Sequence, residues 1–228
     1  MAEASLFTIS LFLITTVLTL WLFYKVGNSK SLIFGILIWM AIVGLLGIYG
    51  FFRVRDAIPP RFIFLLVPGV LFVIMLLTSK KGKAFTNQLD LKWLTLLHII
   101  RIPVEIVLFF AFIEGLIPDV MTFEGYNYDI LSGLTAPIIY YLVFVKKRLG
   151  KRGLLAWNFI CLGLLLNILT IAVLSAQTPF QVFAFDQPNI GVTYFPFVWL
   201  PTVIVPMVLY AHLASIKQLL YSKETLKT

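Results

Sequence analysis

Three ionisable side chains occupy one short apolar stretch of the sequence, HIIRIPVE at residues 98–105. Because an α-helix turns by about 100° per residue, Arg101 lies about 60° around the helix axis from His98, and Glu105 lies about 20° from it. The three side chains therefore form one polar stripe, which in a bilayer faces the interior of a helix bundle. Arg101 and Glu105 are also four residues apart, so they can neutralise each other on the same helix.

The two histidines of the chain are predicted to lie at the same depth. His98 follows Lys92 by six residues, about 9 Å of helical rise, and His212 precedes Lys217 by five residues, about 8 Å. An asparagine on another apolar segment reaches this level, and a tyrosine lies slightly deeper. We therefore expect one ligand-binding site lined by His98, Arg101, Glu105, Asn158, Tyr210 and His212. The alternative is that each histidine is a locally satisfied polar residue.

Two imidazoles at one level permit a proton relay, polar recognition of a ligand, a metal site, or haem held by two histidines. Retinal bound as a Schiff base is excluded, because the middle of the last apolar segment reads VIVPMVL and Lys217 lies at its end. The HxxxH pair of membrane metallohydrolases and the GxSG motif of rhomboid proteases are also absent from the sequence. Haem or a metal ion stays open as a cofactor, and no catalytic residue is assigned.

The composition identifies the solvent around these groups. Hydrophobic residues make up 61% of the 228 residues, charged residues only 12%, and the mean hydropathy is +1.00. Too little polar surface is available to cover a water-soluble globule, so the chain is predicted to be an all-α integral membrane protein. The single cysteine, Cys161, lies in an apolar run and reads as a small buried hydrophobe, and no internal disulfide is possible.

Charge-poor intervals give the number of spans, because a bilayer core of about 30 Å needs about 20 apolar residues in a helix. We predict one domain, a seven-helix transmembrane bundle over residues 1–228. The expected spans are residues 5–25, 31–53, 61–79, 93–116, 127–146, 153–176 and 193–217. The connecting loops are short and leave no room for a separate soluble domain.

The last predicted span carries prolines at positions 196, 201 and 206. Each internal proline removes a backbone hydrogen bond and frees a carbonyl, which a neighbouring helix or a water-lined cavity must satisfy. We expect a kinked helix that lines a cavity. A helix bent simply to pack is the alternative.

The basic residues predict the orientation. Of the 18 lysines and arginines, fourteen fall on one side of the predicted spans, Arg101 lies inside a span, and three lie on the opposite side, Arg53, Arg55 and Arg61. The positive-inside rule then places the N-terminus outside and the C-terminus in the cytoplasm, in the plasma (inner) membrane. The net charge of +8 is explained by this topology and by attraction to anionic lipids at the cytoplasmic face, so no nucleic-acid partner is inferred.

Two hypotheses about function follow. In the first, the protein is a receptor-like sensor or a carrier with a polar cavity between the fourth, sixth and seventh spans. There Arg101 binds an anionic or carbonyl group of a small molecule, and Glu105 tunes the arginine. In the second, the protein is a membrane-embedded redox protein or enzyme, dependent on haem or a metal, that uses His98 and His212. The sequence leaves open whether the protein is an enzyme.

The orientation is testable with a reporter inserted between Arg148 and Arg152. We expect the reporter to be cytoplasmic, because this loop carries five of the fourteen basic residues. Protease accessibility or a compartment-sensitive fluorescent fusion measures this directly. An external signal from the loop would show that the predicted orientation is inverted.

Overall fold

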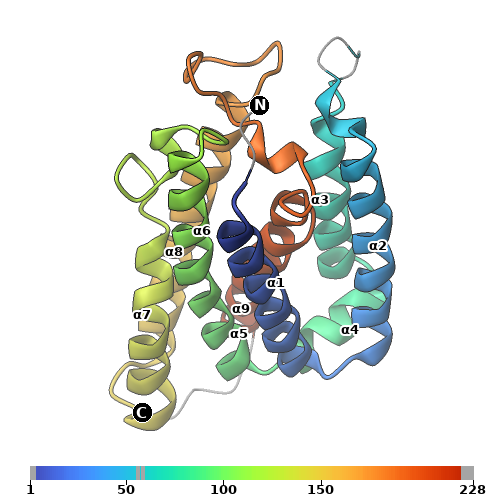
Figure 1. Ribbon diagram of the computed structural model, residues 1–228. Helices are drawn as coiled ribbons and strands as arrows, with labels where there is room; N and C mark the ends of the chain where they lie inside the picture. The colour runs from blue at the N-terminus through green and yellow to red at the C-terminus, as the bar shows by residue number, and fades with distance from the viewer. Residues whose placement is uncertain (1–3, 55–56, 58–59, 222–228) are drawn as a thin grey trace.

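The computed structural model describes residues 4–54, 57 and 60–221. Within this part of the chain the fold is 75% helical and contains no strand, which confirms the all-α prediction. The helices run up and down through an elongated bundle, with the start of the chain at one end and the end of α9 at the other (Figure 1). The principal helices are α1 (Leu6–Gly27), α2 (Lys30–Ile48), α3 (Ile63–Thr78), α4 (Lys80–Gln88), α5 (Leu91–Leu97), α6 (Arg101–Ile113), α7 (Ile130–Tyr140), α8 (Lys151–Leu174) and α9 (Val205–Tyr221).

Helices α1 and α2 form a tight hairpin whose ends are set by local capping. The Ser5 hydroxyl accepts a hydrogen bond from the Thr8 amide at 3.2 Å, and this bond caps the first turn of α1. Asn28 ends the helix in the left-handed region, with φ of 48°, which asparagine adopts more readily than most residues. Ser29 then caps α2 by accepting from the Leu32 amide at 3.3 Å. The connection between the two helices is therefore only two residues long.

Helix α4 was not predicted from the sequence, and it turns away from α3 by 83°. Ser79 lies between the two helices and caps α4 by accepting from the Gly82 amide at 3.1 Å. Gly82 is needed for the sharp turn, because a Cβ atom there would lie 2.3 Å from the Leu76 carbonyl oxygen. The lysines of this segment led to its prediction as a loop, whereas they occupy the exposed side of a short helix.

Residues Leu91–Ile113 form one continuous apolar span made of three helical segments. A 3-10 turn, η2 (His98–Ile100), joins α5 to α6. Pro103 explains the tighter turn, because it has no N–H to donate to the carbonyl of Ile99 and its ring crowds that carbonyl. The turn places His98 and Arg101 where the helix changes its winding.

Helices α7 and α9 adjoin the π-helical segments η4 (Tyr141–Val145) and η6 (Leu200–Ile204), respectively. Pro206 cannot donate to the Thr202 carbonyl, and that carbonyl instead accepts a hydrogen bond from Trp39 Nε1 at 3.3 Å. A side chain of α2 thus satisfies the group that the proline frees. The last span was predicted to begin at residue 193, but it begins at Leu200, because residues 194–198 form a bend and turns. The shorter 3-10 turns are η1 (Phe51–Arg53), η3 (Asp119–Met121) and η5 (Gly191–Thr193).

Five of the described helical segments are long and apolar enough to cross a membrane, and the bent pair α3 and α4 raises the number to six. The segment Ile130–Val145 is apolar but shorter. The described part of the chain therefore contains five to six candidate spans. The seventh span and the orientation of the termini stay predictions.

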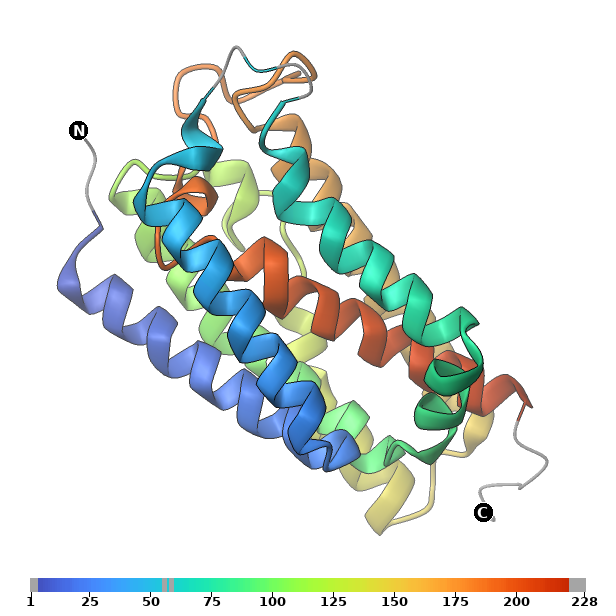
Figure 2. The same cartoon turned by 90° about the vertical axis from the view of Figure 1, so that its right-hand side faces the viewer.

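The most deeply buried of these spans is the last one, Leu200–Tyr221. It packs against α3, α5 and α8, and it lies behind α2 and α3 in the rotated view of Figure 2. By contrast, only 22% of the apolar windows of α2 and α8 is buried. The core of the bundle is therefore organised around α9, and the outer helices present apolar side chains to their surroundings.

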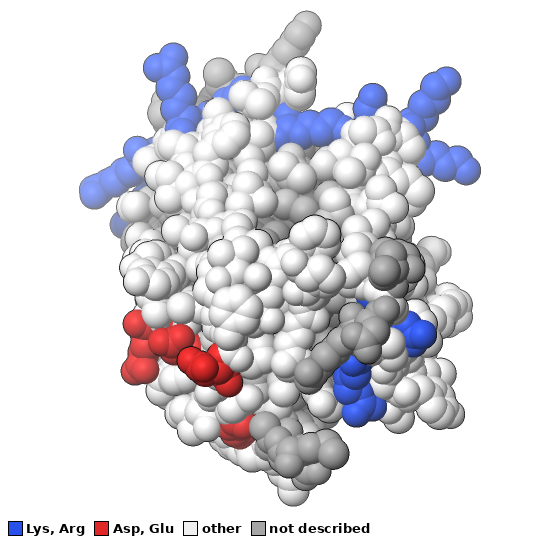
Figure 3. Space-filling model, turned by 90° about the horizontal axis from the view of Figure 1, so that it is seen from above, with Lys and Arg blue, Asp and Glu red and all other residues white. Residues whose placement is uncertain are grey.

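The two ends of the bundle differ in charge. Helix ends that carry lysines, at α1, α2, α4, α5, α7, α8 and α9, lie together at the lower end of Figure 1. The opposite end, seen from above in Figure 3, carries acidic side chains gathered on one side of the face. Three residues counted for the orientation, Arg55, Lys223 and Lys227, lie outside the described residues.

Candidate functional site

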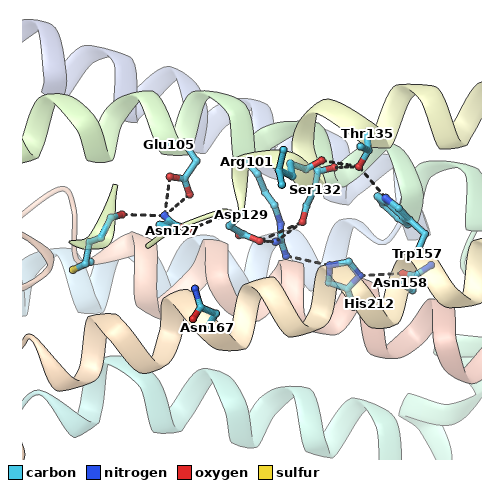
Figure 4. A network of polar contacts seen from close by, with 12 residues as sticks. Arg101, Glu105, Asn127, Asp129, Ser132, Thr135, Trp157, Asn158, Asn167 and His212 are labelled. Carbon is cyan, nitrogen blue, oxygen red and sulfur yellow. Dashed lines mark hydrogen bonds and ion pairs between the residues drawn. The ribbon is translucent and has the colours of Figure 1, made fainter. Parts of the chain in front are cut away.

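Arg101 is the centre of a buried polar network that four helices share (Figure 4). Its Nη1 forms an ion pair with Asp129 Oδ1 and donates to Ser132 Oγ at 3.2 Å. Its Nη2 donates to His212 Nε2 at 3.1 Å. Arg101 is only 2% exposed and Asp129 only 5%. The Arg101 cation is therefore buried, and the Asp129 carboxylate compensates its charge inside the protein, as a buried charge requires.

A close approach of α7 to α6 positions Asp129 and Ser132. At Gly133 a Cβ atom would lie 2.8 Å from Ile102 Cγ1 and 3.0 Å from the Ile102 backbone nitrogen. Glycine thus lets α7 lie almost against the backbone of α6. Asp129 and Ser132 precede Gly133 within about one helical turn, so this contact brings both side chains to the Arg101 guanidinium.

His98 and His212 stack face to face. Their ring centroids are 3.8 Å apart and their planes differ by 15°, while the Trp157 ring meets His98 edge-on at 5.5 Å. Both imidazoles are fully buried. The structure thus places the two histidines, which are far apart in the sequence, in direct contact at one level of the bundle.

The partners of His212 define its protonation. Arg101 can only donate, so Nε2 of His212 accepts the hydrogen bond from the guanidinium. Nδ1 lies 3.0 Å from Asn158 Oδ1, an acceptor, while the Asn158 amide nitrogen donates to the Leu154 carbonyl at 2.9 Å. His212 is therefore the neutral tautomer with its proton on Nδ1, and Asn158 fixes this tautomer.

His98 has no such partners. Among the described residues, neither of its ring nitrogens has a hydrogen-bonding partner, and the same holds for Arg101 Nε. A buried polar group without a partner costs about 1 to 3 kcal/mol of stability. Three such atoms on two neighbouring side chains form the least satisfied polar part of this network, and such sites are frequently functional.

Glu105 occupies a second part of the network, and it is not the ion-pair partner of Arg101. Both Glu105 oxygens accept from Asn127 Nδ2 at 2.7 Å. Asn127 Oδ1 in turn accepts from the Asp129 amide at 3.1 Å. The expected pair of Arg101 with Glu105 is wrong, because the loop before α7 reaches into the bundle and supplies Asp129 as a closer anion.

Tyr210 lies apart from this network. Its hydroxyl forms a hydrogen bond with Thr86 Oγ1 of α4 at 2.9 Å, and its ring packs against Phe23 of α1. The side chain points toward the α2 and α3 side of α9, whereas His212 points toward α6 and α8. The expectation that Tyr210 belongs to the same site is not met, because two residues along a helix change the facing direction by about 200°.

The residues that sequence analysis missed, Asn127, Asp129, Ser132 and Trp157, are central to the network. Asn127 and Asp129 stand at the outer end of the predicted span 127–146, where polar residues are usually exposed. The available signal was the polar sequence NYD directly before an apolar segment, a pattern typical of a helix start. That signal predicts local structure but not burial.

A small cavity of about 70 Å³ adjoins the carboxylates of this network. Its lining comes from α3, α6, α8, the last span and the loop segments near them, and it includes Glu105 and Asp129 among apolar residues such as Val104, Leu165 and Val205. The cavity is lined by the three expected spans, the fourth, sixth and seventh, and α3 also contributes to its wall.

The geometry does not fit haem held by two histidines. Axial imidazoles lie on opposite faces of a porphyrin and point a nitrogen at the iron, whereas His98 and His212 stack ring on ring. In the part of the chain that the structure describes, no three His, Cys, Asp or Glu side chains are grouped to hold a metal ion. The arrangement instead suits hydrogen bonding and proton transfer.

The sequence from residue 58 to 220 matches a family described as a domain of unknown function, DUF8737. The chain belongs to this family. All residues of the polar network, from His98 to His212, lie within the matched region. Comparisons with curated proteins and with solved structures give no match.

The ion pair can be tested by comparing Asp129→Asn with Glu105→Gln. We expect Asp129→Asn to lower the free energy of unfolding by about 3 to 5 kcal/mol, because it leaves the buried Arg101 cation without a compensating charge. Glu105→Gln keeps an oxygen that accepts from Asn127, so the expected loss is below about 1.5 kcal/mol. Unfolding of the purified protein in mixed micelles measures both. A double variant with Asp129→Asn and Arg101→Met should recover stability, and equal losses from the two single variants would contradict the assignment.

The histidine pair allows a matched comparison of His98→Leu with His212→Leu. Both substitutions remove the stacking and change the side-chain volume equally. Only His212→Leu also leaves Arg101 Nη2 and Asn158 Oδ1 without partners, so it should be less stable by about 2 to 4 kcal/mol. Thermal and detergent unfolding measure the difference. A greater loss for His98→Leu would show that His98 has partners of its own.

Proposed function

We propose that this protein is a multi-pass membrane protein, a sensor or a carrier, that binds a small molecule at the buried network around His98, Arg101 and His212. The observation that carries the proposal is the unsatisfied state of His98, which is fully buried and has no hydrogen-bonding partner among the described residues. Polar groups inside a bilayer are expensive and are usually kept for binding or transfer.

The unpartnered atoms suggest the chemistry of the ligand. Arg101 Nε is a donor, and a neutral His98 ring offers one donor and one acceptor. A carboxylic acid, or another carbonyl compound that also carries a donor, complements all three atoms. Because Asp129 already neutralises Arg101, an uncharged carbonyl ligand adds no net charge to the bundle interior. Arg101 then acts as a directional donor rather than as a free cation.

The remaining groups hold the binding residues in place. Asn158 fixes the tautomer of His212, and His212 with Asp129 fixes the guanidinium of Arg101. Glu105 is joined to Asp129 through Asn127, so a change at the outer loop reaches the arginine through two hydrogen-bonded side chains. The stacked geometry of the histidines gives no support to the alternative of a haem-dependent redox protein.

The proposed location is the plasma (inner) membrane, with the lysine-rich end in the cytoplasm. The positive-inside rule supports this orientation, and the structure gathers the lysine-bearing helix ends at one end of the bundle (Figure 1). Anionic lipids at the cytoplasmic face are the partners that this charge favours.

A stability screen tests the proposed binding. The purified protein is unfolded by heat in the presence of small carboxylic acids and their amides, alongside His98→Leu. A ligand at 100 times its Kd stabilises the folded state by about 2.7 kcal/mol, and we expect this shift in the wild type but not in His98→Leu.

Two results would count against the proposal. One is a panel in which no compound stabilises the wild type, and the other is a compound that stabilises His98→Leu equally. An absorption spectrum of the same preparation is the control for the haem alternative, because haem bound to the purified protein would give a Soret band.

A further inference from the structure

A second cavity, independent of the polar network, lies between α2, α3 and the last span. Its volume is about 350 Å³, within the range of small-ligand pockets. Apolar side chains dominate its walls, and Tyr210 and Thr202 are its polar members. The lining includes Leu32, Ile36, Trp39, Phe72, Leu76 and Met207.

The cavity faces the surroundings between α2 and α3. In Figure 2, α9 is seen between α2 and α3, and few residues of the apolar span of α2 are buried. Gly35 lies in the cavity wall, and a Cβ atom placed there would meet no atom within 4 Å. Gly35 is exposed, so this part of the apolar lining is a surface that another molecule can cover.

Helix α4 adjoins the cavity at the lysine-rich end. Its Thr86 hydroxyl is hydrogen bonded to the Tyr210 hydroxyl, which lies at the cavity wall. The 83° bend between α3 and α4 turns α4 across the end of the bundle instead of continuing α3. Helix α4 therefore lies at this end of the cavity, while α2 and α3 contribute residues to its walls.

Two exposed lysines flank the same end of this cavity. Lys30 begins α2 two residues before the lining residue Leu32, and Lys80 begins α4 four residues after Leu76. Lys81 and Lys83 add charge on the exposed side of α4. An apolar slot with a cluster of cations at one end matches a molecule that has a hydrocarbon chain and an anionic head.

We propose that this cavity binds one anionic phospholipid from the leaflet at the lysine-rich end. One acyl chain lies against Gly35, Trp39 and Phe72, and the phosphate group contacts Lys30 and Lys80. The site does not depend on the polar network, since Tyr210 points away from His212 and bonds to Thr86. Binding here joins α2 to α3 through the lipid.

Native mass spectrometry tests the proposal with defined lipids. The full chain is reconstituted in vesicles of equimolar palmitoyl-oleoyl phosphatidylglycerol and phosphatidylcholine, extracted in mild detergent, and examined for retained lipid. We expect one phosphatidylglycerol molecule per chain, retained about tenfold more than phosphatidylcholine. Equal retention of the two lipids would overturn the proposal, and so would a dimer that carries no lipid.

Gly35→Leu fills the apolar slot and should abolish lipid retention. Gly163→Leu is the matched control, because Gly163 on α8 also has no atom within 4 Å of a Cβ position but lies outside the cavity. Retention by Gly35→Leu, or its loss from both variants, would overturn the proposal. Thermal unfolding shows whether each variant is folded.

The double variant Lys30→Gln and Lys80→Gln changes only exposed side chains, so it keeps the proposal testable if Gly35→Leu fails to fold. It should remove the preference for phosphatidylglycerol, whereas Lys146→Gln with Lys147→Gln, at the same end of the bundle, should retain it. An unchanged preference in the first double variant would overturn the role of the two lysines.

Discussion

The buried ion pair of Arg101 and Asp129 is the interaction on which the centre of the bundle depends. It ties α6 to the start of α7, and the same guanidinium reaches α9 through His212. A cation at this depth is tolerated only with a compensating anion and satisfied hydrogen bonds. Consequently α6, α7 and α9 have little freedom to shift independently, and Gly133 keeps α7 close enough for the pair to form.

The two stacked histidines differ in their hydrogen bonding. Arg101 donates to one ring nitrogen of His212, and Asn158 accepts from the other. The role of His212 is therefore structural. His98 shares the stacking and the burial but has no hydrogen-bonding partner in the described part of the chain. Such unpartnered ring nitrogens lower stability, which is why the functional proposal rests on His98.

Much of the fold was predictable, because apolar segments of about 20 residues in a chain this hydrophobic permit few other folds. Helical periodicity, together with the number of residues from the nearest lysine, also predicted that His98, Arg101, Asn158 and His212 lie at one level. The structure places these four residues together. These arguments use distances along a helix, which sequence determines well.

Other features depend on how segments fold back, which periodicity does not determine. Asp129 follows a loop, and no sequence rule shows that this loop enters the bundle. Helix α4 was missed because its lysines and Gly82 resemble a loop, and its sharp bend depends on a backbone contact at Leu76. Tyr210 was misplaced because depth alone was considered and the direction around the helix was not.

The separation of the ion-pair partners along the chain has a consequence for biogenesis. Asp129 follows Arg101 by 28 residues, and His212 follows by 111. At about 5 to 20 residues per second, ribosomes make Asp129 about 1 to 6 s after Arg101. During that interval Glu105, four residues further along the span Leu91–Ile113, is the acid within reach of Arg101, and the high mean hydropathy of 2.2 favours insertion of the span. Insertion of this span and assembly of the bundle are therefore separate steps, and Arg101 meets Asp129 only in the second.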